Sequence, residues 1–231
     1  MKHLILLTGF LFLSNLFKAQ SAQYQWGFKL GSTQAFTERP SAIITDSYGN
    51  FFTTGFYTDT ADFNPGAGVN SLQGISRECY LAKYSSAGSL LWAKNIGMTY
   101  IQEGQALAIS NGQLILTGSY SNGQTDLDPG AGTELTPLIY SHGAFMSKFD
   151  TSGNFIWGKS FPSFSASSIK TVKIDANNNI VIGGSFQYTV DLDPSAATAT
   201  IAASATDGFI AKYDSNGNYI WGFKIGSTQT D

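Results

Sequence analysis

Paired acidic side chains recur in this sequence and are its clearest candidates for chemistry. Asp126 and Asp128 lie in TDLDPGAG, Asp191 and Asp193 lie in VDLDPSAA, and ADFNPGAG from Ala61 has the same pattern. Carboxylates two residues apart point to the same side of a strand, where they can ligate calcium together with loop carbonyls. Alternatively, the second acid or Asn accepts backbone N–H groups in a turn before proline. Because two carboxylates make a weak site, we expect the turn and no cofactor, with calcium as the alternative.

Other reactive side chains are scarce. Residues 20–231 contain one histidine, His142 in YSHGAF, and one cysteine, Cys79. We expect His142 in a surface loop, because no other repeat has a histidine there. Cys79 aligns with Ala144 and Gly208, which favours a small strand-edge residue over a reactive thiol. A single cysteine also excludes an intrachain disulfide. We therefore expect no catalytic residue.

The elements that would hold these residues repeat along the chain. Tryptophans recur at intervals of 66, 65 and 64 residues, at Trp26, Trp92, Trp157 and Trp221. SSAGSLLW, DTSGNFIW and DSNGNYIW precede the last three, and each predicts a tight turn followed by a strand. The turn glycines, Gly88, Gly153 and Gly217, supply the positive φ of a hairpin.

Three lysines also recur just upstream, in alternating segments that predict the partner strands. They are Lys83 in CYLAKYS, Lys148 in FMSKFD and Lys212 in FIAKYD. They could line a binding face, but we expect solvated residues whose stems pack along the strand.

A second hairpin opens each repeat. SAIITDSYGNFFTTGFY from Ser41 has counterparts from Leu107 and Val172, and a glycine recurs late in the second strand at Gly55, Gly118 and Gly184. A glycine inside a strand marks a bulge or a close backbone approach. The first repeat therefore predicts four antiparallel strands, over residues 41–46, 51–57, 79–84 and 90–96.

Four short strands in each unit of 64 to 66 residues predict an all-β fold of β-propeller blades. The expected repeats cover about 36–96, 101–161 and 168–225, with one extra strand over 24–30. In the last strand, YIWGFKI, alternation places Tyr219, Trp221, Phe223 and Ile225 on one face. Three blades are fewer than a closed ring needs, so we expect an incomplete propeller that joins further blades of a longer chain, or an assembly of several chains.

These motifs together resemble the SBBP-type β-propeller repeat of secreted proteins from Bacteroidetes and relatives. The similarity rests on the turn and tryptophan at 152–157, FIAKYD at 209–214, DSYGNFFTTGF at 46–56 and DLDPG at 126–130, and it covers nearly all of 24–231. The resemblance implies an extracellular propeller within long proteins exported by the type IX system. The C-terminal sorting domain of such proteins is absent from this sequence.

Two enzymatic alternatives remain open. DSNGNYIW is similar to the tryptophan-docking motif of quinoprotein dehydrogenases, but the sequence has no vicinal cysteine pair and no extended cofactor segment. A glycan-active hydrolase or lyase would use carboxylates from different blades that meet near the propeller axis. No local pattern selects such a pair.

The N-terminus predicts export. Residues 1–19 begin with the basic Lys2, continue with an apolar run over 4–17 and end at Ala19, which is typical of a signal peptide cleaved there or after Ala22. The run is shorter than the ~20 residues of a membrane span. We therefore expect a secreted or cell-surface protein in which residues 20–231 form the repeat region.

Composition agrees with these assignments. The chain has 13 Lys and Arg against 16 Asp and Glu, a net charge of −3, and loss of residues 1–19 removes two lysines to leave −5. Nucleic acids and anionic membranes bind to basic surfaces, so we expect neither as a partner. We expect a non-catalytic scaffold or binding module whose partner is a protein or a glycan.

Overall fold

The computed structural model describes residues 27, 38–97, 101–162 and 167–226. Within them the fold is all-β, without helices, and consists of three four-stranded antiparallel sheets, each with its strands in chain order. These sheets are the blades of a β-propeller-type repeat. The predicted signal peptide, Trp26 and all of the extra strand at 24–30 except Gly27 lie outside the described residues.

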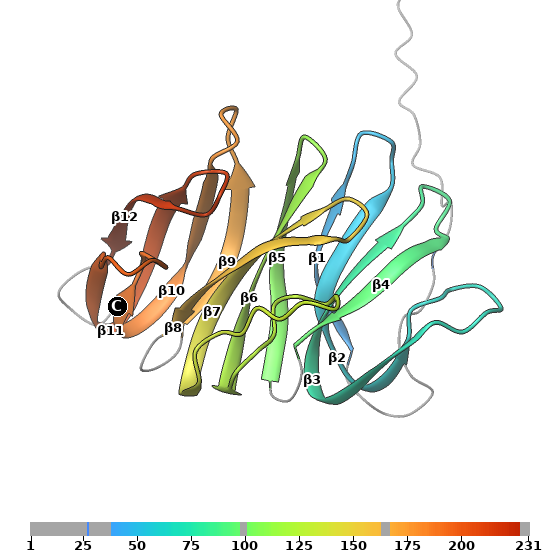
Figure 1. The fold of residues 1–231 in the computed structure, drawn as a ribbon, viewed down its shortest axis with the longest axis horizontal. Coiled ribbons are helices and arrows are strands. Elements are labelled where there is room, and N and C mark those ends of the chain that lie inside the picture. Colours follow the sequence, from blue (N-terminus) through green and yellow to red (C-terminus); the bar gives the residue numbers. More distant parts are fainter. Residues whose placement is uncertain (1–26, 28–37, 98–100, 163–166, 227–231) are drawn as a thin grey trace, which may run out of the picture.

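The blades follow one another along the chain and stand side by side in an open arc (Figure 1). Blade 1 comprises β1 (Arg39–Thr45), β2 (Phe51–Asp62), β3 (Ser71–Tyr84) and β4 (Leu90–Ile96). Blade 2 comprises β5 (Ile101–Ser110), β6 (Gln113–Gly123), β7 (Ile139–Asp150) and β8 (Phe155–Pro162). Blade 3 comprises β9 (Ser167–Ile174), β10 (Ile180–Asp191), β11 (Thr200–Tyr213) and β12 (Tyr219–Ile225). The first strand of each later blade packs across the preceding one, β5 on β1 to β3 and β9 on β5 to β7.

The second and third strands are longer than the sequence pattern predicts. In blade 1, β2 extends to Asp62 and β3 begins at Ser71, whereas we expected strands at 51–57 and 79–84. A register shift interrupts the pair after Thr58, and the next residue, Asp59, has φ 60°. Asn122 and Tyr188 have the same left-handed conformation at the matching shifts of blades 2 and 3. Because the register shift interrupts the alternation of apolar and polar residues, the sequence pattern does not reveal that the strands continue beyond it.

Beyond each shift the hairpin folds back over its own blade. Tyr84 Oη donates a hydrogen bond of 2.8 Å to Phe63 O, although Tyr84 lies at the far end of β3. A straight strand of that length would separate the two by about 40 Å. Tyr213 Oη reaches Leu192 O in the same way, at 2.7 Å. We call the segments 59–76, 122–141 and 188–205 the fold-back hairpins.

A bulge in the last hairpin corrects the expected faces of β12. Lys212 pairs with Trp221 while the next residue, Tyr213, pairs with Tyr219, so Ile220 is the extra residue. Neighbouring residues of β11 point to opposite faces, so Tyr219 and Trp221 do as well. Our expectation that Tyr219 shares a face with Trp221 was therefore wrong. The ring of Tyr219 packs against that of Tyr213, with ring centroids 5.9 Å apart. The same bulge occurs in blades 1 and 2.

Candidate functional site

The recurrent acid motif closes the loop at the tip of each fold-back hairpin. Asp126 Oδ1 accepts backbone N–H groups from Asp128 at 3.1 Å and from Glu134 at 2.8 Å. Asp191 Oδ1 accepts them from Asp193 at 3.0 Å and from Ala199 at 2.8 Å. The second acids each accept one more N–H, Asp128 from Gly130 and Asp193 from Ser195.

The apolar residue between the acids docks the hairpin. Phe63, Leu127 and Leu192 are all buried. Leu127 lies over Gly158 of β8, and Leu192 lies over Gly222 of β12, where a Cβ would be 2.7 Å from the Leu192 Cδ1 atom. Among the described residues, no three acidic, histidine or cysteine side chains gather as a metal site requires. The hydrogen bonds to backbone amides and the buried apolar residue give the motif the geometry of a turn that anchors a hairpin.

The recurrent lysines join neighbouring blades. Lys83 Nζ donates to Thr151 O of blade 2 at 3.0 Å, and Lys148 Nζ donates to Ser215 O of blade 3 at 2.7 Å. Lys148 is buried, and this desolvation lowers its pKa. Our expectation of a solvated residue is therefore wrong for Lys148.

The recurrent tryptophans and turn glycines belong to the same junctions. Gly88, Gly153 and Gly217 have φ of 85°, 84° and 79°. Trp92 lies against Gly153 of blade 2 and Trp157 against Gly217 of blade 3. We call the tryptophan and lysine of one blade, with the turn they contact on the next, the junction clamp. Trp221 and Lys212 occupy the clamp positions of blade 3.

The late strand glycines admit a close backbone approach. A Cβ at Gly55 would be 1.9 Å from Arg39 O, and one at Gly184 would be 2.0 Å from Ser168 O. A Cβ at Gly118 would be 2.3 Å from Glu103 O. All three lie where the first strand of the blade shifts register, so a side chain here would push that strand away.

Cys79 and His142 do not lie where we expected them. Cys79 is fully buried in the middle of β3, paired with Phe56 on one side and Ile96 on the other, and is no strand-edge residue. Burial raises the pKa of its thiol to about 12. His142 is exposed, as expected, but lies within β7 rather than in a loop.

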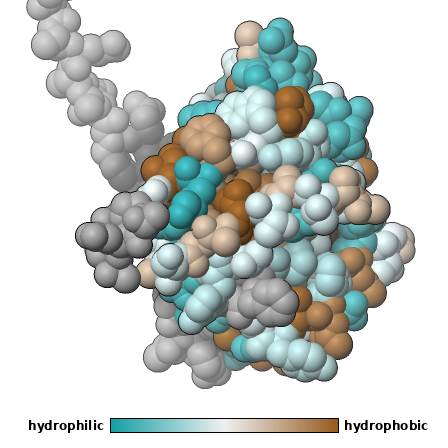
Figure 2. Space-filling model, turned by 90° about the vertical axis from the view of Figure 1, so that its left-hand side faces the viewer, coloured by the Kyte–Doolittle hydropathy of each residue, from teal (hydrophilic) through white to brown (hydrophobic). Residues whose placement is uncertain are grey.

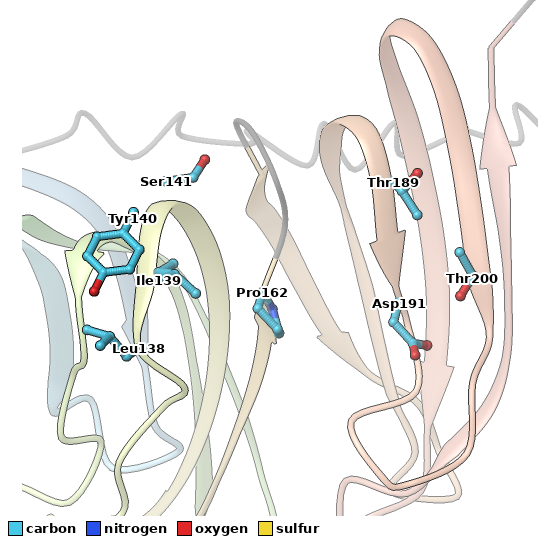
Figure 3. Close-up of a pocket in the computed structure, with 8 residues that line it drawn as sticks. All are labelled: Leu138, Ile139, Tyr140, Ser141, Pro162, Thr189, Asp191 and Thr200. Atoms are coloured by element: carbon cyan, nitrogen blue, oxygen red, sulfur yellow. The ribbon is translucent and has the colours of Figure 1, made fainter.

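A cleft between the fold-back hairpins of blades 2 and 3 is the best candidate for a binding site. It has a volume of about 560 Å³. Figure 3 shows Leu138, Ile139, Tyr140 and Ser141 on one side, Thr189, Asp191 and Thr200 on the other, and Pro162 between them. The tyrosine is almost entirely exposed, at 88%, and Leu138 is exposed at 55%. Sequence reasoning missed this cleft because its two walls come from different repeats.

The electrostatics of the cleft depend on Asp191. It is the sole acid among the described residues that line the cleft. No described lysine or arginine forms an ion pair with it. Thr189 and Thr200 add hydroxyl groups to the same wall. The cleft therefore offers an apolar wall opposite a wall that carries one negative charge.

A second cleft, of about 530 Å³, lies between the first hairpins of blades 1 and 2. Its lining is more polar and includes Asp46, Asn50, Lys83 and Asn111. Asp46 Oδ1 accepts the backbone N–H groups of Tyr48 and Asn50, both at 2.9 Å. The carboxylate of Asp46 therefore binds the backbone of its own turn, and its Oδ2 atom lies 3.9 Å from Lys83 Nζ.

Two buried acids, Glu78 and Asp207, were not singled out from the sequence. Glu78 of β3 is 1% exposed, and its Oε1 atom accepts N–H groups from Ile75 and Ser76. Its Oε2 atom has no hydrogen-bond partner among the residues that the structure describes. Burial raises the pKa of this carboxyl group. The matching residues are Gly143 and Asp207, so a buried acid recurs here in blade 3 but not in blade 2.

The described part of the chain includes no helix long and apolar enough to cross a membrane. No family model matches the sequence. The chain is similar to an uncharacterized WD repeat-containing protein, L264, of Acanthamoeba polyphaga mimivirus, with 27% identity over 187 residues. The similarity covers 74% of this chain and only 13% of the viral protein. Together with the three four-stranded sheets, it supports a repeat protein of the β-propeller type.

Proposed function

We propose that this chain is a non-catalytic, exported β-propeller module that binds an extended protein segment in the cleft between blades 2 and 3. The observation that carries the proposal is the pair of unlike walls in that cleft. Leu138, Ile139 and Tyr140 suit apolar side chains, and Asp191 suits a lysine or arginine. The preferred segment is therefore apolar with an adjacent basic residue.

The use of the recurrent residues supports a role without catalysis. The acids of the repeat cap backbone amides, and its lysines and tryptophans clamp the blades together. A glycosidase needs two carboxyl groups about 5–10 Å apart. The described first strands carry one acid, Glu103, and this group pairs with Arg39 and Arg77.

Export is supported by residues 1–19, which have the basic start, apolar run and small residue of a signal peptide. The similarity to SBBP-type repeats, on the motifs given above, agrees with a location outside the cell. Fractionation of the native host that left the protein inside the cytoplasm would contradict this part of the proposal.

Selection of phage-displayed random peptides against the full chain tests the binding site. We expect apolar sequences with a basic residue, whose affinity falls at least tenfold in Tyr140→Ser and in Asp191→Asn. The second substitution removes the charge but leaves Oδ1 to accept the two backbone amides. Tyr48→Ser is the matched control, because Tyr48 is 84% exposed and lines the other cleft.

Three outcomes would overturn the proposal. Loss of binding in Tyr48→Ser but not in Tyr140→Ser would move the site to the polar cleft. Binding on a glycan array that depends on Tyr140, without peptide binding, would make the ligand a carbohydrate. Turnover of a polysaccharide that one Asp→Asn change abolishes would make the protein an enzyme.

A further inference from the structure

Blade 3 exposes an apolar face that the other blades bury. Trp221, Phe223 and Ile225 of β12 are 40%, 49% and 50% exposed. The register places Ile210 of β11 and Val181 of β10 beside them on the same face. We call these five residues the open face. Figure 2 views the molecule from this side and shows brown, apolar surface between teal, hydrophilic areas.

Three of the five positions are interior in blades 1 and 2. Trp221 corresponds to the half-buried Trp92 and Trp157, and Phe223 corresponds to the half-buried Lys94 and Lys159. Ile225 corresponds to Ile96 and Phe161, which are 0% and 2% exposed. Ile210 corresponds to Leu81 and Met146, and Val181 to Phe52 and Ile115, all of which are buried. In each case the next blade packs on the face. The open face therefore corresponds to the surface by which blades 1 and 2 each contact the next blade.

The clamp residues of blade 3 are also in place. Lys83 and Lys148 reach across to a turn carbonyl of the next blade, whereas Lys212 Nζ lies 2.7 Å from Asp175 Oδ2 of its own blade. Trp221 stacks on Phe223, with ring centroids 5.6 Å apart, instead of lying on a turn glycine. Lys212, beside Trp221 in the sheet, completes the pair that a turn would contact.

Sequence and burial indicate which partner fits. The segment before blade 1, YQWGFKLGSTQ from Tyr24, matches β12 and its continuation, YIWGFKIGSTQ from Tyr219, at nine of eleven positions. Blade 1 therefore follows a tryptophan-containing segment whose sequence is almost identical to that of β12 and its continuation. A head-to-tail second copy fits less well, because its turn glycine, Gly88, is already buried.

We propose that the open face of blade 3 binds a further four-stranded blade of the blade 1 type. Its turn glycine lies on Trp221, and its turn carbonyl accepts a hydrogen bond from Lys212, which leaves Asp175. The junction continues the two that the structure already contains.

Appending a second copy of residues 35–97 after Gln229 tests this directly. The design keeps residues 1–229 and is in register, because Gly226–Gln229 repeats Gly31–Gln34. In the unmodified chain, we expect Trp221→Ala to change Tm by less than about 1 °C, because its ring is exposed. In the fusion, the same change should lower Tm by about 5 °C, which is also the loss that we expect for Trp157→Ala in both proteins.

A second variant separates docking from a general effect of the added sheet. Gly→Val at the copy of Gly88 should abolish the new sensitivity to Trp221→Ala, as expected for two residues in contact. Hydrogen exchange of the β12 amides gives an independent measurement and should slow at least tenfold in the fusion. If the added sheet fails to fold, β12 exchange stays fast, and the proposal is wrong.

Self-association is the remaining occupant to test. Sedimentation of the unmodified chain should show a monomer at all concentrations. A dimer that dissociates in Trp221→Ala would assign the open face to a second copy and overturn the proposal. Equal effects of Trp221→Ala in the chain and in the fusion would overturn it as well.

Discussion

Trp157 lies so close to the turn glycine of the next blade, Gly217, that a Cβ built there would be 3.1 Å from Trp157 Cη2. Gly217→Ala therefore combines a clash between blades with the strain of an alanine at φ 79°. We expect a loss of about 2–3 kcal/mol in unfolding free energy, measured by denaturant titration. Gly112→Ala is the matched control: its φ is 73° and no atom lies within 4 Å, so about 1 kcal/mol should be lost. Equal losses in the two variants would disprove the contact.

The fold-back hairpin of blade 3 begins with a strained tyrosine. Tyr188 has φ 58° and is 62% exposed, so its side chain gains little from packing. Asn tolerates this conformation better and already occupies the matching position 122. We expect Tyr188→Asn to raise Tm by about 2 °C, measured by calorimetry. Tyr48→Asn, at an exposed position without positive φ, should leave Tm unchanged; a gain there too would point to loss of a surface aromatic.

Buried Glu78 makes stability depend on pH. Its pKa is raised, chiefly by desolvation, so the folded state binds its proton more tightly than the unfolded state. The stability that this proton contributes is present below pH ~4.5 and is lost as the pH rises through the folded pKa. Glu78→Gln should therefore raise Tm at pH 8 and have little effect at pH 4, as melting curves across this range will show. As a control, Glu103→Gln breaks an ion pair and should lower Tm at pH 8. If Glu78→Gln also lowered Tm at pH 8, the raised pKa of Glu78 would be refuted.

The buried thiol of Cys79 should be inert in the folded protein. Burial raises its pKa to about 12, so the thiolate is scarce at neutral pH, and the sulfur is also shielded from reagents. We expect alkylation by iodoacetamide to proceed only at the rate of unfolding, and to become fast in urea. Rapid labelling without denaturant would show that β3 opens locally or that the thiol is accessible.

The acid motif should stabilise the hairpin without calcium. Asp191→Ala leaves two backbone N–H groups without their acceptor, which we expect to cost about 1–2 kcal/mol. Millimolar calcium and EDTA should leave the melting curve of the wild-type chain unchanged. Asp193→Asn retains an acceptor for the Ser195 N–H and serves as the mild control. If calcium raised the Tm of the wild type but not of Asp191→Ala, the site would be a metal site.

The sequence predicted the blades because tryptophans and turn glycines recur with the period of the sheet. It also marked the Asp126 motif as a turn, since short polar side chains before proline act locally. It could not predict what depends on two repeats at once. The contact from Lys148 to Ser215 O and the cleft between Leu138 and Asp191 both join residues more than 50 positions apart.

Bulges and hinges explain the local errors. The extra residue Ile220 reverses the face of Tyr219, and alternation alone gives no sign of it. Asp59, Asn122 and Tyr188 share a left-handed backbone without sharing a residue type. Asp and Asn tolerate this conformation, so local preference is overridden only at Tyr188, in the hairpin that Leu192 docks on Gly222.

The unoccupied side of blade 3 also gives the molecule a direction of unfolding. In repeat architectures, stability is close to a sum of unit terms and nearest-neighbour coupling terms. Blade 2 is coupled on both sides, whereas β12 has no neighbour across its tryptophan face among the described residues. We therefore expect the β12 amides to open at a lower free-energy cost than those of blade 2. Fluctuations of the native state therefore begin at β12 and move inward, and a ligand that bridges blades 2 and 3 would slow them.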